Sequence, residues 1–379
     1  MLRSLVLFCS FTTLVLGAGR SSSEITEAVE RAMAQTQAKG MAIAVIEEGE
    51  VRHVSAHGVR NEKGDPLRTD TVMYGASLTK TVIAYMVLQL VDAGKLTLDT
   101  PLSSLLPRPA PTYEPDPRYA DWRPLAGDVR WEKITPRIVL THSTGFANFG
   151  FLEPDKKLRI HFEPGSRYAY SGDGFQFLQF AIEQGLGLDV GELTRQQFER
   201  LGMSRTSLIW RPDFAENLAD GWDDQGRIEA HDERSKVRAA GSMDTTIADL
   251  ARFAAALVRG DGLSHHARRE LARPQLAITT ANQFPTLAPE LPLDARRKDL
   301  AAGLGVVVFH GPQGPGFFKG GHNGTTANTF VCLEDSKNAV LILSNDVRAE
   351  AAFAELIRFI LGETGVPYAW EYGDRAGTS

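Results

Sequence analysis

Two residues with complementary chemistry, Ser77 and Lys80, stand one helical turn apart at the start of an apolar segment. Residues 82–91 carry no charge, glycine or proline, and Gly94 follows soon after, so the sequence predicts a buried helix that ends before this glycine. Residues three apart share a helical face, which would place Lys80 beside the Ser77 hydroxyl. A partly desolvated lysine can help to remove the serine proton and so create a nucleophile. The helix N-terminus would add N–H groups where an oxyanion could form.

The same two residues also have a structural interpretation. Ser77 could cap the helix, and Lys80 could extend its ammonium group into solvent, which is the commoner fate of such residues. A Ser-x-x-Lys pattern occurs by chance about once in a chain of this size. The choice between the two interpretations therefore depends on the rest of the sequence.

The bulk composition is that of an ordinary globular protein. The chain has 379 residues, of which 43% are hydrophobic and 23% charged, which is enough for one large or two smaller domains with a substantial core. The formal net charge is −6, and no basic patch is evident, so nucleic acid is not an expected partner.

The N-terminus has the pattern of a targeting segment. Arg3 precedes an apolar stretch at residues 5–16 and small residues at 17–19, which predicts a secretory signal peptide over residues 1–19 and a secreted or periplasmic protein. The apolar stretch is short for a bilayer span, so no stable membrane anchor is expected. Cleavage would leave Cys332 as the sole cysteine, without an intrachain disulfide, and we expect it to be a small buried hydrophobe.

Strand patterns are confined to the two ends of the chain. Alternating or apolar runs predict five strands, which form one antiparallel sheet in the simplest assembly, with the terminal helices packed on it. The predicted α/β part covers about residues 24–98 and 241–362, and a helical lobe of about residues 99–240 is inserted between the first and last strands. Catalytic groups would line the cleft between the two parts. The predicted strands are residues 41–46, 51–57, 303–309, 329–333 and 339–343, and the predicted helices include 24–37, 175–184 and 349–361, with helix starts at Thr135-Pro136 and Thr246.

Two further segments offer chemistry. Tyr170 lies in a tight loop just before a predicted helix, and His322 lies among glycines at a strand position, where the backbone can approach a ligand closely.

Taken in order, these segments resemble those of the serine β-lactamase-related hydrolases, the superfamily of class C β-lactamases, D-aminoacyl peptidases and carboxylesterases with a β-lactamase fold. The chain has Ser77-x-x-Lys80, then Tyr170-Ser171-Gly172 where the family has Tyr-x-Asn, then His322-Asn323-Gly324 where it has Lys-Thr-Gly or His-x-Gly. The resemblance covers about residues 26–361. It implies an α+β fold of the β-lactamase/transpeptidase-like type.

The resemblance also implies roles for individual residues. Ser77 would attack a carbonyl and form an acyl-enzyme, and Lys80 and Tyr170 would activate it as a hydrogen-bonded pair. Either member of the pair could be the resting base, because a nearby ammonium lowers a phenol pKa while a phenolate raises an amine pKa. The backbone N–H groups of Ser77 and Thr325 would form the oxyanion hole.

Other residues would bind substrate or shape the site. Gly172, His322, Asn323 and Gly324 would line the substrate site, whereas His142 is expected to tie down its loop. No cofactor or metal is implied, and the expected partner is a small-molecule or short-peptide substrate. The oligomeric state is left open by the sequence.

Two departures from the family pattern bear on the substrate. Gly172 lacks the asparagine amide that would hold an acylamino group, and His322 is mostly neutral near pH 7, unlike a lysine. We therefore expect an ester or small amide substrate. A D-amino-acid-specific peptidase, a weak β-lactamase and a noncatalytic binding protein on the same fold are the alternatives.

Overall fold

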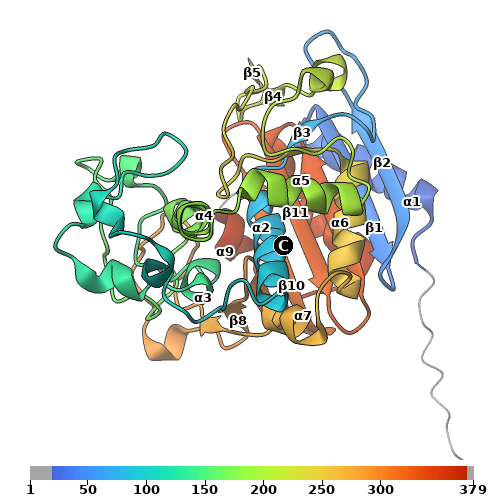
Figure 1. Cartoon of the computed structure of the whole chain (residues 1–379). Coiled ribbons are helices and arrows are strands. Elements are labelled where there is room, and N and C mark those ends of the chain that lie inside the picture. The colour runs from blue at the N-terminus through green and yellow to red at the C-terminus, as the bar shows by residue number, and fades with distance from the viewer. Residues whose placement is uncertain (1–18, 374–379) are drawn as a thin grey trace, which may run out of the picture.

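The computed structural model describes residues 19–373, so the predicted signal peptide lies, apart from Gly19, outside the described residues. A sheet with helices on both faces forms one side of the molecule, and a lobe of helices and loops forms the other (Figure 1). Within residues 19–373, no helix combines the length and the apolar character needed to cross a membrane.

The main sheet has eight antiparallel strands in the order β2-β1-β12-β11-β10-β9-β8-β7. The N-terminal strand β1 lies inside the sheet, where Met41 is opposite Ser344 of β12 and His57 of β2. The strands are β1 (Gly40–Glu47), β2 (Glu50–Gly58), β7 (Leu276–Ala277), β8 (Leu300–Ala302), β9 (Val307–Gly311), β10 (Gly314–His322), β11 (Ala327–Leu333) and β12 (Asn338–Ser344).

The prediction of five strands is wrong. Strand β10 was missed because glycines interrupt its apolar pattern, and β7 and β8 are too short to show one. The predicted run at 303–309 is also divided, since β8 ends at Ala302 and β9 begins at Val307.

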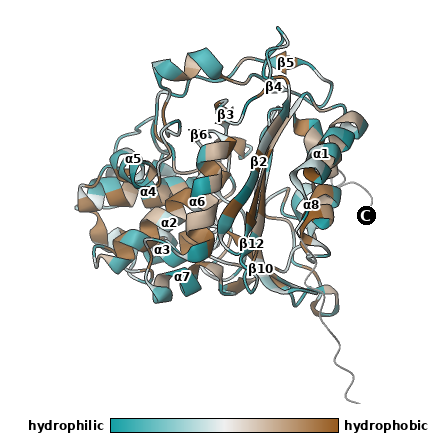
Figure 2. Ribbon diagram, turned by 90° about the vertical axis from the view of Figure 1, so that its right-hand side faces the viewer, coloured by the Kyte–Doolittle hydropathy of each residue, from teal (hydrophilic) through white to brown (hydrophobic). Residues whose placement is uncertain are grey.

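Both faces of the sheet are covered, which explains the continuous apolar run in β1. Met41, Ile43 and Val45 pack with α1 (Ser22–Thr36) and α8 (Phe353–Leu361) on one face. The alternate residues Ala42, Ala44 and Ile46 pack into the core on the other face, with α2 (Leu78–Asp92) and α6 (Ile247–Arg259). Figure 2 shows this sandwich with the sheet between the two helical layers.

The predicted helix starts are present. The Thr246 side chain accepts the N–H of Asp249 at the start of α6, and the Thr135 side chain caps α3 (Pro136–Leu140). The remaining helices are α4 (Gly172–Leu186), α5 (Val190–Arg200), α7 (His265–Ala272) and α9 (Tyr368–Tyr372), with 3-10 segments η1 (Leu102–Leu105), η2 (Ala110–Thr112), η3 (Arg123–Leu125), η4 (Val129–Lys133), η5 (Gly150–Leu152), η6 (Pro212–Asn217), η7 (Leu293–Ala295) and η8 (Val347–Ala352).

Helix α2 joins the two sides of the molecule, because it contacts β10 and β11 as well as α5 and α7. Residues 99–240 contain α3, α4, α5 and only the short strands β4 (Gly221–Trp222) and β5 (Ile228–Glu229). Another short pair, β3 (Met73–Tyr74) with β6 (Asp244–Thr245), leads the chain into α2. Cys332 is fully buried in β11, as predicted.

Candidate active site

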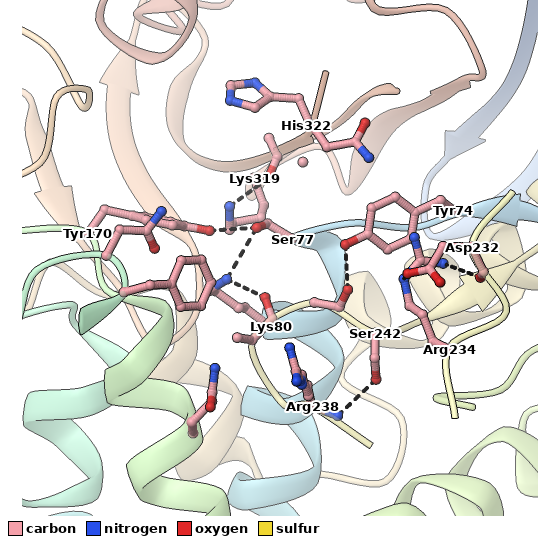
Figure 3. Close-up of a pocket in the computed structure, with 18 of the residues that line it drawn as sticks. Tyr74, Ser77, Lys80, Tyr170, Asp232, Arg234, Arg238, Ser242, Lys319 and His322 are labelled. Atoms are coloured by element: carbon pink, nitrogen blue, oxygen red, sulfur yellow. Dashed lines mark hydrogen bonds and ion pairs between the residues drawn. The ribbon is translucent and has the colours of Figure 1, made fainter. Parts of the chain in front are cut away.

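Ser77 lies at the sharp turn between β3 and α2. The preceding Ala76 has φ 46°, a left-handed conformation that is uncommon for a residue other than glycine. The Ser77 hydroxyl makes no helix-capping hydrogen bond. It accepts instead from the Tyr170 hydroxyl at 2.7 Å and from Lys80 Nζ at 3.2 Å (Figure 3). The turn therefore presents the serine to two groups that can move its proton.

Lys80 does not reach solvent, so its alternative interpretation as a surface residue is wrong. The side chain is 1% exposed and also donates to the carbonyl oxygen of Ala240. Burial lowers the pKa of Lys80 well below its ordinary value, and the charge of Lys319 lowers it further.

Tyr170 is fixed by stacking. Its ring packs on His142 with centroids 4.2 Å apart, and Nδ1 of His142 accepts the N–H of Ser171 at 3.1 Å, which gives this histidine the positioning role expected of it. Burial raises the pKa of Tyr170. Because burial disfavours both an ammonium at Lys80 and a phenolate at Tyr170, it favours a neutral amine as the resting base and a neutral phenol beside it.

Strand β10 passes directly beside the serine. A Cβ added to Gly321 would lie 3.0 Å from the backbone nitrogens of Ser77 and Leu78, so any other residue here would require the two segments to move apart. Gly324, by contrast, has nothing within 4 Å of the same added atom. The Lys-x-Gly tripeptide beside the serine is therefore Lys319-Gly320-Gly321, and the predicted position of this motif at His322-Asn323-Gly324 is wrong by three residues.

This shift of the motif also bears on the predicted oxyanion donor, the backbone N–H of Thr325. The Thr325 N–H donates to Oδ1 of Asn323 at 2.9 Å, so it is already engaged. The Asn323 N–H donates to Thr326 O across the β10–β11 turn at 3.1 Å. Since N–H groups alternate in direction along a strand, the N–H of His322 faces the opposite edge, toward Ser77. The strand geometry therefore turns the N–H of His322, and not that of Thr325, toward Ser77.

This edge of β10 is open to the active-site cavity, which has a volume of about 660 Å³ and is lined by Ser77, Lys80, Tyr170, residues 319–323 and others. Along the described strands, β9 pairs with β10 only as far as Phe318, which leaves residues 319–322 for a ligand. The His322 side chain turns to Glu350, with Nδ1 2.8 Å from a carboxylate oxygen. His322 and Asn323 line the cavity; Gly324 and Thr325 do not.

Gly172, like Gly324 and Thr325, does not line the cavity. Its N–H donates to both oxygens of Asn148, to the backbone carbonyl at 2.8 Å and to Oδ1 at 3.0 Å. The Phe149 ring occupies the space in which a side chain at position 172 would begin. Asn148 and Phe149 line the cavity in its place.

Several residues that line the cavity were not predicted from the sequence. Glu371, on α9, is 5% exposed and accepts from Nε2 of Gln283 at 2.7 Å. Its charge raises the pKa of Lys319, although burial lowers that pKa overall. Lys319 lies three residues before His322, among the same glycines, and could have been found there, whereas Glu371 and Gln283 carry no local signal. The other missed lining residues include Phe149, Phe151 and Phe284.

A sequence model of the family described as Beta-lactamase matches residues 25–363. The chain belongs to this family. Among Beta-lactamase-family relatives it is similar to the D-alanyl-D-alanine-carboxypeptidase/endopeptidase AmpH of Escherichia coli K12, with 27% identity over 79% of this chain and 77% of AmpH. It is also similar to esterase EstB of Burkholderia gladioli, with 30% identity over 35% of this chain and 31% of EstB. Lovastatin esterase of Penicillium rubens is 29% identical over 41% of this chain and 44% of that protein.

Solved structures confirm the β-lactamase/transpeptidase-like fold. The octameric penicillin-binding protein homologue from Pyrococcus abyssi superposes with a TM-score of 0.70 at 18% identity, covering 91% of this chain and 78% of that one. The D-alanine carboxypeptidase AmpC from Burkholderia cenocepacia gives a TM-score of 0.69 at 18% identity, with 90% and 98% covered.

Proposed function

We propose that this protein is an exported serine hydrolase that cleaves an ester or a small amide through an acyl-Ser77 intermediate. The observation that carries the proposal is the convergence of Tyr170 and Lys80 on the Ser77 oxygen, at 2.7 and 3.2 Å, at the edge of a cavity. Export rests on the N-terminal sequence pattern.

The geometry supports an acyl-transfer mechanism. Ser77 Oγ bonds to the substrate carbonyl carbon while its proton passes to the neutral amine of Lys80. The carbonyl oxygen becomes an oxyanion between the N–H groups of Ser77 and His322. The carbon–oxygen or carbon–nitrogen bond to the leaving group then breaks, and Tyr170 and Lys80 deliver a proton to that group. A water molecule attacks the acyl carbon in the same way, and the proton returns to Ser77 as the acid leaves.

The esterase and the peptidase alternatives are both represented among the relatives by name. The corrected motif restores a lysine, Lys319, so the argument from a missing lysine no longer counts against a D-amino-acid-specific peptidase or a weak β-lactamase. Lys319 is nevertheless 4% exposed, and its Nζ donates to Gly320 O at 2.5 Å. The absence of an asparagine amide at Gly172 still favours an ester or small amide. A noncatalytic binding protein is disfavoured because Tyr170 and Lys80 both hydrogen-bond to the Ser77 oxygen.

The test compares the mature protein with Ser77→Ala, using a short-chain nitrophenyl ester, a chromogenic cephalosporin and a D-Ala-D-Ala peptide. Ser336→Ala, in the exposed turn between β11 and β12, is the control serine variant. We expect ester turnover and fluorophosphonate labelling that are lost only in Ser77→Ala. Preferred cleavage of the peptide would make the peptidase alternative correct, and absence of labelling in folded protein would support a binding role.

A further inference from the structure

An aromatic side chain occupies the position at which the family pattern has an amide. An added Cβ at Gly172 would lie 2.4 Å from Cε1 and 2.5 Å from Cζ of the Phe149 ring, and 3.2 Å from Asn148 O. Gly172 and Phe149 are therefore coupled, since any side chain at position 172 requires the ring to move.

The Phe149 ring stacks on a second aromatic ring, that of Phe151, which is exposed to solvent. Phe149 and Phe151 are stacked, with centroids 5.1 Å apart and an interplanar angle of 11°, and both line the active-site cavity. Phe151 is 63% exposed, and its neighbour Leu152 is 62% exposed. Large apolar side chains that remain exposed together at the edge of a cavity indicate a surface that a ligand covers.

The loop that carries these rings is anchored to the catalytic segment. The N–H of Gly150 donates to Oδ2 of Asp173 at 2.6 Å, and the Asp173 N–H donates back to Asn148 O at 2.9 Å. Asp173 lies three residues after Tyr170, in the first turn of α4. The rings therefore have a fixed position relative to the tyrosine. Phe284, whose ring is 5.3 Å from that of Tyr170, adds a third aromatic wall.

We propose that Phe149 and Phe151 form a platform for the acyl group of the substrate, and that this substrate is an ester or amide of a flat, apolar or aromatic carboxylic acid. The proposal rests on the proposed function and names its substrate class. An acyl group of this kind stacks on the rings and removes them from water. The faces of the two rings offer no hydrogen bond to the peptide group of an N-acylamino acid, whereas they stack well on a phenyl ring, so we expect the apolar acyl group to be preferred although Asn148 lines the cavity nearby.

The test measures kcat/KM for nitrophenyl esters that share one leaving group: acetate, phenylacetate and N-acetylglycinate. For the unmodified protein we expect phenylacetate to exceed N-acetylglycinate by about tenfold or more. Phe151→Ala, an exposed change that leaves the core intact, should lower the phenylacetate value about tenfold and the acetate value much less, because an acetyl group has no ring to stack on this platform. The control is Leu293→Ala, which removes an even more exposed apolar side chain (81%) outside the cavity and should change neither value.

Substitutions at both Gly172 and Phe149 test the same proposal by attempting to reverse the substrate preference. Gly172→Asn alone should lose activity because of its collision with Phe149, whereas Gly172→Asn combined with Phe149→Ala should recover it and reverse the preference toward N-acetylglycinate. Equal losses on all three esters in Phe151→Ala, or a preference of the unmodified protein for N-acetylglycinate, would overturn the platform. Turnover that survives Ser77→Ala would overturn the proposed function instead, so the two failures are distinct.

Discussion

The Nζ atoms of Lys80 and Lys319 lie 4.9 Å and 5.1 Å from the centroid of one ring, that of Tyr170. Both lysines are buried, so a positive charge on one disfavours a charge on the other. The carboxylate of Glu371 favours the charge on Lys319, and the charge on Lys319 disfavours one on Lys80. This ordering leaves Lys80 as the amine that is free to accept a proton.

The first prediction concerns the pH dependence of kcat/KM. Activity should rise as the pH increases through the lowered pKa of Lys80, because only the neutral amine accepts the serine proton. Lys319→Met removes the neighbouring charge, which raises the pKa of Lys80 and should move this acid limb to higher pH. Lys319→Arg keeps the charge and should leave the limb in place. An acid limb that is the same in all three proteins would exclude this coupling.

The second prediction separates the two candidate Lys/His-x-Gly positions. Gly321→Ala forces a methyl group against the backbone of Ser77 and should lower kcat about a hundredfold or more, as the loss of an oxyanion donor does. Gly324→Ala adds the same methyl group to open space and should retain nearly full activity. Steady-state kinetics on both variants would distinguish the two positions. A large loss in Gly324→Ala with little loss in Gly321→Ala would restore the original assignment of the motif to His322-Asn323-Gly324.

The third prediction concerns stability and Asp173. Burial raises the pKa of this carboxyl from 3.8 to about 7. Between about pH 4 and 7 the folded state therefore holds more protons than the unfolded state, so its stability falls as the pH rises through this window. Asp173→Asn cannot ionise and can still accept the N–H of Gly150. It should increase the unfolding free energy by about 1–3 kcal/mol at pH 8, and the gain should disappear near pH 4.

Denaturant unfolding at several pH values would measure this effect, with the exposed Asp213→Asn as the control. A difference between Asp173→Asn and the unmodified protein that does not depend on pH would argue against ionisation as its cause.

The fourth prediction concerns the stability cost of the buried base. The pKa of Lys80 is lowered in the folded state, so between the folded and unfolded pKa values the folded protein binds fewer protons than the unfolded one. The resulting loss of stability, relative to an apolar side chain, is present in full once the pH is below both values. Lys80→Met should abolish turnover and raise the Tm by a few degrees. Lys95→Met, at an exposed position, should change neither. A lower Tm for Lys80→Met would mean that the hydrogen bonds of Lys80 outweigh its desolvation.

Local sequence patterns were sufficient for several of the helices and for the contact between Ser77 and Lys80. The uncharged run after Ser77 predicted α2, and the i, i+3 spacing predicted the contact between Ser77 and Lys80 that the structure shows. The capping residues Thr135 and Thr246 marked the starts of α3 and α6. Each of these inferences uses interactions between residues fewer than five positions apart.

The errors at the candidate site involve contacts between distant segments. Two tripeptides three residues apart, Lys319-Gly320-Gly321 and His322-Asn323-Gly324, both fit the family pattern, and only the close approach of β10 to Ser77 separates them. The glycines that permit this approach also removed the alternation by which a strand is recognised. The same holds for two other pairs of neighbours, Phe149 with Gly172 and Glu371 with Lys319. Chain folding brings each pair together, so no local sequence pattern predicts it.

The position of β1 between β2 and β12 has a consequence for the growing chain on the ribosome. Met41 pairs with a residue about three hundred positions later, so the ladder that joins the two parts of the sheet cannot form until β12 has been synthesised. Until then β1, which is apolar on both faces, has only its hairpin partner β2 and exposes an unpaired edge. Ser77, at the start of α2, is made early, whereas β10, which completes its surroundings, comes late. A partly synthesised chain therefore carries Ser77 without the strand that would make it reactive.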